Sequence, residues 1–140
     1  MTTARTRTLA VVVVLAAIAT TFRVGTARST DEPIDVHALI ATVSPDTRPH
    51  DVSLTIASAG KALADQARAC VASNVSRTSC DALASAAAWA QTAAVATLQC
   101  PAEARSALRD LTLLTDRVTR ATTAGPTTRL RLDLPPQPRC

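Results

Sequence analysis

Aromatic side chains are almost absent from this sequence. Its 140 residues include one Phe, one Trp and no Tyr, namely Phe22 and Trp89. The apolar area that aromatic rings usually bury must therefore come from Ala, Leu, Val and Ile. A single domain of this length can bury only one modest core. We therefore expect a small fold that needs covalent help to be stable.

Lysine is also scarce, and the positive charge is carried almost entirely by arginine. The net charge of the chain is +4, but Arg5, Arg7 and Arg23 lie in the N-terminal segment that we expect to be removed. Without these three arginines the net charge falls from +4 to +1. Binding to nucleic acid requires a clustered basic surface and, for single strands, stacking aromatic rings. Because the chain offers neither, we expect no nucleic-acid partner.

Recognisable catalytic, nucleotide-binding and metal-binding motifs are missing as well. There is no phosphate-binding loop, dinucleotide fingerprint or calcium loop, and no serine elbow accompanies the two histidines, His37 and His50. No cysteine pair has the two-residue spacing typical of structural zinc sites. We therefore expect no catalytic residue, metal or cofactor. An enzyme of unknown class is the third functional alternative, and it requires one of the histidines in a pocket with carboxylates or a serine.

The N-terminal segment has the pattern of a secretory signal peptide. Two arginines precede an unbroken apolar run from Leu9 to Ala19, and no acidic residue occurs there. Gly25 and Ala27 provide the small residues of a peptidase site, so we expect cleavage after Ala27. The alternative is an uncleaved membrane anchor formed by residues 9–24. The apolar run is shorter than the roughly 18 residues that a spanning helix needs, which favours the signal peptide.

Four cysteines lie beyond this segment, and they are Cys70, Cys80, Cys100 and Cys140. An even number of cysteines in a small exported chain predicts two disulfide bonds. Residues 81–99 contain no Gly or Pro, and as one helix they hold Cys80 and Cys100 about 30 Å apart. A disulfide needs Cα atoms within about 7 Å of each other. The expected pairs are therefore Cys70 with Cys80 and Cys100 with Cys140.

Helical periodicity and turn residues divide the rest of the chain. Residues 28–50 are predicted to be a linker that holds a short helix opened by Pro33, with a strand as the alternative, followed by a loop over residues 44–50. Residues 51–124 are predicted to form the helical domain, and residues 125–140 an extended proline-rich tail. The predicted fold class is therefore all-α: a small disulfide-stapled bundle of three to four helices after an N-terminal signal segment, with an extended C-terminal arm.

Three local patterns refine this picture. Thr78 and Asp81 have the spacing of a capping box at the start of the helix that contains Trp89. The main apolar stripe of that helix consists of Leu83, Ala87, Ala90, Ala94 and Leu98. Its small side chains let a neighbouring helix approach closely. The segment from Arg129 to Leu134 alternates like a strand, so we expect it to lie along its own bundle or to pair with the edge of a partner.

Two residues are candidate sites. Trp89 points away from the alanine stripe, so it is either the main core anchor or an exposed contact for a partner protein. Asn74 is the only asparagine, and it begins an N-glycosylation acceptor, Asn74-Val75-Ser76, on a predicted turn. A glycan on Asn74 is expected only if the chain comes from a virus or a eukaryote.

The leading functional hypothesis is a small exported protein-binding module that presents its surface to another protein. Self-association is a second use of alanine-rich helix faces. The alternative is a membrane-anchored structural or envelope-associated factor, whose contact with the membrane is made only through residues 9–24. The expected location is secreted or extracytoplasmic under the first hypothesis and membrane-anchored under the alternative.

Overall fold

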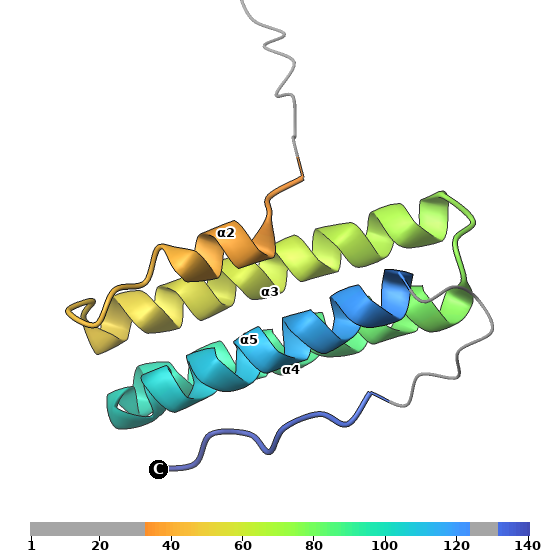
Figure 1. Ribbon diagram of the computed structural model, residues 1–140. Helices are drawn as coiled ribbons and strands as arrows, with labels where there is room; N and C mark the ends of the chain where they lie inside the picture. Colours follow the sequence, from red (N-terminus) through yellow and green to blue (C-terminus); the bar gives the residue numbers. More distant parts are fainter. Residues whose placement is uncertain (1–32, 124–131) are drawn as a thin grey trace, which may run out of the picture. The chain divides into compact units, whose positions relative to one another are not determined.

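The computed structural model describes residues 33–123 and 132–140. The expected signal segment, the cleavage site after Ala27 and the first part of the expected tail lie outside these ranges. Within them the protein is all-helical, with four α-helices, one 3-10 turn and no strand (Figure 1). This confirms the predicted all-α bundle for the described part of the chain.

Three long helices and one short helix form the bundle. α2 (Val36–Ala41) is short, whereas α3 (Pro49–Ala72), α4 (Arg77–Gln99) and α5 (Ala104–Thr123) are long, and η1 (Pro101–Glu103) links the last two. α3 and α4 form a hairpin with the most extensive helix–helix contact, α5 packs against both, and α2 lies on α3 and α5 (Figure 1). Alanine, the strongest helix former, is frequent throughout the long helices.

The first two helices begin at positions that differ from the prediction. α2 begins at Val36 rather than Pro33, because the Asp35 carboxylate accepts the backbone N–H of His37 at 2.9 Å and caps the helix there. α3 begins at Pro49, inside the predicted loop. Proline suits the first position of a helix, where its missing N–H leaves no donor unpaired.

The turn between α3 and α4 depends on Asn74. This residue has a φ of 55°, in the left-handed region that asparagine tolerates better than most residues. It directly follows Ser73, the C-cap of α3, and so ends that helix. α4 then starts with Ser76 as its N-cap. The predicted capping box of Thr78 and Asp81 is wrong, because Thr78 already lies inside α4 and no side chain caps this helix.

One disulfide bond joins the ends of two helices, and the other joins the end of a helix to the C-terminal segment. Cys70 is bonded to Cys80 and Cys100 to Cys140, and in each pair the Cα atoms are 5.5 Å apart. The first bond closes the α3–α4 hairpin at its turn, and the second attaches the C-terminus to the opposite end of α4. This is the pairing that the helix-length argument selects, because α4 is continuous and separates Cys80 from Cys100.

Alanine makes up much of the core, and close approach of the helices takes the place of large side chains. Gly60 of α3 faces Ala90 and Gln91 of α4. A Cβ atom on Gly60 would lie 3.1 Å from the Ala90 Cβ and 3.2 Å from the Gln91 backbone nitrogen, below the 3.4 Å at which ordinary contacts begin. The larger fully buried side chains include Val52, Ile56, Leu111 and Leu114.

The predicted stripe of α4 is buried except at its end. Leu83, Ala87, Ala90 and Ala94 are buried, but Leu98 is 43% exposed, so its place in the stripe was predicted wrongly. With 3.6 residues per turn, Leu98 lies roughly 60° around the helix from Leu83. This drift carries it off the face that α3 covers.

The C-terminal segment, residues 132–140, runs beside α4 and α5 without helix or strand (Figure 1). Leu132 packs against the core, and the indole N–H of Trp89 donates to the carbonyl oxygen of Pro135 at 2.8 Å. The strand period predicted through Leu134 therefore produces no strand in the described residues.

Candidate functional site

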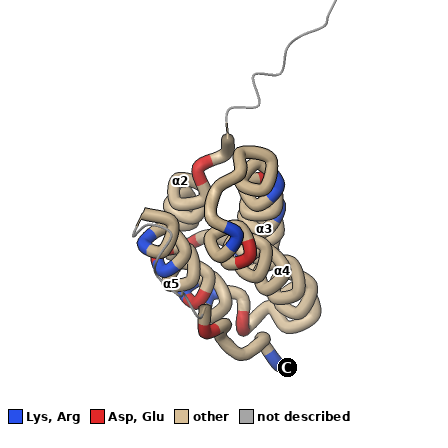
Figure 2. The backbone as a smooth tube through the Cα atoms, turned by 90° about the vertical axis from the view of Figure 1, so that its right-hand side faces the viewer, with Lys and Arg blue, Asp and Glu red and all other residues tan. Residues whose placement is uncertain are grey.

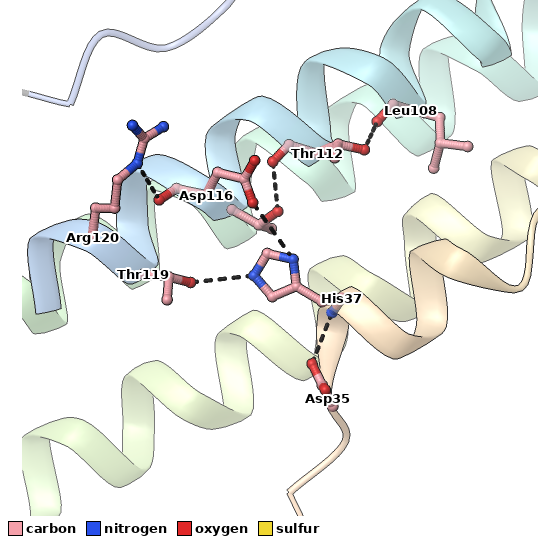
Figure 3. Close-up of polar contacts among 8 residues, drawn as sticks. Asp35, His37, Leu108, Thr112, Asp116, Thr119 and Arg120 are labelled. Atoms are coloured by element: carbon pink, nitrogen blue, oxygen red, sulfur yellow. Dashed lines mark hydrogen bonds and ion pairs between the residues drawn. The ribbon is translucent and has the colours of Figure 1, made fainter. Parts of the chain in front are cut away.

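A polar cluster connects α2 to α5 around His37. Asp116 and Thr119 lie one turn apart on α5, and the His37 ring lies against both of them (Figure 3). The Nδ1 atom of His37 is 3.6 Å from Asp116 Oδ1, and its Nε2 atom is 3.3 Å from Thr119 Oγ1. Helical spacing thus places a carboxylate and a hydroxyl on the same face, facing one imidazole.

A cavity of about 370 Å³ lies beside this cluster. His37 and Thr119 line it together with side chains from the core, among them Leu63, Leu83 and Val118. Its volume is within the range of sites that hold small ligands. Of the two histidines singled out in the sequence, His37 lies at this cavity together with one carboxylate, that of Asp35, and His50 lies exposed in the first turn of α3.

The chemistry available to this cluster is limited by its exposure. In hydrolases, a nucleophilic hydroxyl is activated by a base that a carboxylate orients from its other side. However, the His37 and Asp116 side chains are 45% and 46% exposed, so water weakens their interaction. Two further threonines, Thr115 and Thr122, line the cavity. Their hydroxyls donate to carbonyl oxygens of their own helix at 2.8 Å, so neither hydroxyl is directed at the oxygen of a bound substrate. The geometry supports a structural contact that holds α2 on α5.

Trp89 is a core residue in this structure. Only 3% of it is exposed, and its indole N–H is satisfied by the Pro135 carbonyl oxygen. Of the two roles that the sequence left open, this geometry corresponds to the core anchor. A partner protein can reach the indole ring only if the segment around Pro135 moves.

The outer face of α4 is an uncharged surface of the described bundle. We define it by five exposed residues, which are Ala84, Ala88, Gln91, Val95 and Leu98. They follow one another at helical spacing, and no Lys, Arg, Asp or Glu occurs between Asp81 and Glu103. Most of α4 is accordingly free of charge in Figure 2, whereas α3 and α5 carry both signs. Val95 is 59% exposed and Leu98 43% exposed.

Sequence reasoning overlooked this outer face, although the signal was present. The periodicity of α4 draws attention to the stripe that begins at Leu83, and the row from Ala84 to Leu98 repeats the same spacing on the neighbouring face, which begins roughly 100° around the helix. A row at helical spacing that lacks charge on an otherwise charged bundle is the pattern that could have identified it.

Asn74 lies exposed in the turn between the two cysteines of the first disulfide. Its left-handed backbone conformation gives it a structural role that is independent of any modification. Its side chain is accessible on the surface, as an acceptor for a glycan must be.

Neither a metal cluster nor a membrane-spanning helix occurs in the described residues. In residues 33–123 and 132–140, no three His, Cys, Asp or Glu side chains come together in a way that could hold a metal ion. All four cysteines are in disulfide bonds. None of the helices in the described part of the chain has the length and hydrophobicity to cross a membrane.

The fold and these surfaces define a small, all-helical bundle stapled by two disulfides, with an uncharged helix face and no built catalytic centre in the residues described. Comparison with protein-family models, with curated proteins and with solved structures found no match to this chain.

Proposed function

We propose that this protein is a small exported module that works by binding another protein through the outer face of α4. The observation that carries the proposal is the exposure of Val95 and Leu98 on a helix face without charge. Single exposed apolar residues are common on protein surfaces, whereas contiguous apolar patches mark interaction sites. Val95 and Leu98 lie one turn apart on α4, so their side chains extend one such patch.

The composition of the face determines which partner fits it. Ala84 and Ala88 are small and let a partner backbone approach closely, while Val95 and Leu98 supply the larger apolar contacts. An uncharged helix surface loses no ion hydration when it is covered. We therefore propose a partner protein that presents an apolar helical surface of its own, and self-association is the alternative that the test must separate.

The proposed location is outside the cytoplasm. Two disulfide bonds are typical of exported chains and rare in reducing compartments. Residues 1–27 are proposed to be a signal peptide that is removed after Ala27, and an anchor at residues 9–24 is the alternative. The intact mass of the protein from its native host distinguishes them: a chain that starts at Arg28 supports export, and a chain that retains Met1 supports the anchored factor.

Two finer features belong to the same proposal. Residues 125–140 are proposed to form one extended arm on the bundle, which its described part and the Cys140 bond support. Asn74 is proposed to carry a glycan in a viral or eukaryotic source, and its exposure in the turn supports this. A peptide map of the native protein tests the glycan directly.

Site-specific cross-linking tests the interaction surface. A photoreactive side chain at position 95 should yield one discrete cross-linked product in the native secreted fraction, and Leu98→Asp should abolish that product. The matched control carries the same group at position 71, because Val71 is 69% exposed at the end of α3, away from this face. Equal products from both positions contradict the proposal, and a product that contains only this chain indicates self-association.

A further inference from the structure

Three hydrogen bonds join residues 132–140 to the described bundle, and one of them comes from a side chain of the segment: Gln137 Nε2 donates to the Trp89 carbonyl oxygen at 3.5 Å. The other two involve its main chain. The indole N–H of Trp89 donates to the Pro135 carbonyl oxygen at 2.8 Å, and the Arg117 guanidinium donates to the Asp133 carbonyl oxygen at 3.3 Å. Both bonds are therefore made to the main chain of the segment. They depend on its extended course rather than on the identity of the side chains at these positions.

The segment itself is of a type that proteins often bind in grooves. Three of its nine residues are prolines, Pro135, Pro136 and Pro138, and proline favours an extended polyproline II course without internal hydrogen bonds. Proline-rich segments bind to grooves that offer aromatic rings, because little conformational entropy is lost. Trp89 supplies such a ring on α4, and with the segment in place it is only 3% exposed.

The segment does not fill the groove. A cavity of about 470 Å³ lies between it and the start of α5. Glu103 and Asp110 line the bundle side of this cavity, and Arg139 lines the side of the segment. The Gln137 Oε1 atom is buried and has no hydrogen-bond partner among the described residues. The groove thus has room for other side chains, and two carboxylates favour a basic residue near the end of the occupant.

We propose that the face of α4 and α5 around Trp89 is a binding groove for extended, proline-containing segments that carry a basic residue. Residues 132–140 of the chain itself occupy this groove while Cys140 is bonded to Cys100. The bond keeps the internal segment at a high effective concentration, so a segment from another molecule binds measurably only when the bond is absent or substitutions weaken the binding of the internal segment.

This groove is separate from the surface of the proposed function. At 100° per residue, Trp89 lies roughly 140° around α4 from Ala84, which belongs to the outer face. Either site can therefore fail its test while the other passes.

The test uses a synthetic peptide of residues 132–139 and the full chain with Cys100→Ser and Cys140→Ser. Trp89 is the only Trp and the chain has no Tyr, so the protein fluorescence reports on this groove alone. We expect the peptide to produce a saturable blue shift of the emission in the double variant and none in the disulfide-bonded wild type. A control peptide with alanine in place of the three prolines should bind at least about 10-fold more weakly.

Three results overturn the proposal. The first is no saturable shift in a double variant that keeps the helical circular dichroism of the wild type. The others are binding of the control peptide as tight as that of the proline peptide, and binding of the proline peptide to the bonded wild type as tight as to the double variant. A second variant covers the case in which the double variant does not fold. It keeps both disulfides and replaces Pro135, Pro136 and Pro138 by alanine, and it should give, with the same peptide, the saturable blue shift that the wild type lacks. Binding equal to that of the wild type also overturns the proposal.

Discussion

Replacement of Gly60 by leucine tests how closely α3 and α4 approach each other. A Cβ atom alone would lie 3.1 Å from the Ala90 Cβ and 3.2 Å from the Gln91 backbone nitrogen. The Gln91 side chain can rotate away, but these two atoms move only if α4 moves. Overpacking of a close-packed core costs about 1–3 kcal/mol. Because leucine adds three further carbons beyond the Cβ, we expect Gly60→Leu to lower the free energy of unfolding by about 3 kcal/mol.

The smaller substitution Gly60→Ala has two opposing effects. Alanine is favoured over glycine within a helix by about 1 kcal/mol. The contacts at 3.1 and 3.2 Å require the neighbouring atoms to shift by a few tenths of an ångström, and this shift costs a similar amount of stability. We therefore expect the free energy of unfolding of Gly60→Ala to lie within about 1 kcal/mol of the wild-type value. It should be well above that of Gly60→Leu.

Urea denaturation followed by circular dichroism measures both variants, and an unchanged slope confirms that the midpoints report stability. Ser58→Leu is the matched control, because Ser58 is exposed on the same helix, and it should change the free energy by no more than about 0.5 kcal/mol. If Gly60→Leu has an equally small effect, the helices do not approach as described. The account of a core made compact by small residues is then refuted.

Other contacts predict smaller effects. Replacing Cys70 and Cys80 by alanine should lower the free energy of unfolding by about 2.7 kcal/mol, the chain-entropy value for a separation of 10 residues, and an unchanged urea midpoint would contradict this. His37→Ala should cost at most about 1 kcal/mol in the same assay, because His37 and Asp116 are nearly half exposed, and a larger loss would show a stronger anchor for α2. A hydrogen bond from a neighbouring lysine lowers the pKa of Asp65 from its ordinary value of 3.8. The stability that this carboxylate contributes is therefore present above pH 3.8 and is lost as the pH falls through the lowered pKa. The difference in unfolding free energy between wild type and Asp65→Asn should shrink over that range, and a difference that does not depend on pH would contradict the role of the ionised carboxylate.

The helices and the disulfide pairs follow from rules that act over short stretches of sequence. The apolar period and the absence of Gly and Pro between Cys80 and Cys100 predict one long helix, and its length alone keeps these two cysteines apart. The pairing could be derived because a rise of 1.5 Å per residue turns a count of residues into a distance. The short helix near residue 36 was one of two alternatives that the sequence left open, and the other was a strand.

Element boundaries were predicted less well, for local reasons that compete with one another. Pro49 can end a loop or begin a helix, and its sequence context does not decide between the two. Thr78 has the spacing of a cap, but the left-handed turn at Asn74 starts α4 earlier and places Thr78 inside it. Such choices depend on how the whole hairpin closes.

Composition, periodicity and helix length by themselves determined the fold class, the exposed turn at Asn74 and the cysteines that can meet. Only the tertiary structure decided what covers each helix face. Trp89 is covered through a contact to a residue 46 positions away, and His37 meets a threonine 82 positions away. Periodicity shows which residues share a face, but burial is a property of two surfaces, and the second surface comes from a distant part of the chain. For the same reason the outer face of α4, whose residues stay exposed in the described bundle, could be recognised as a surface only after the bundle was assembled.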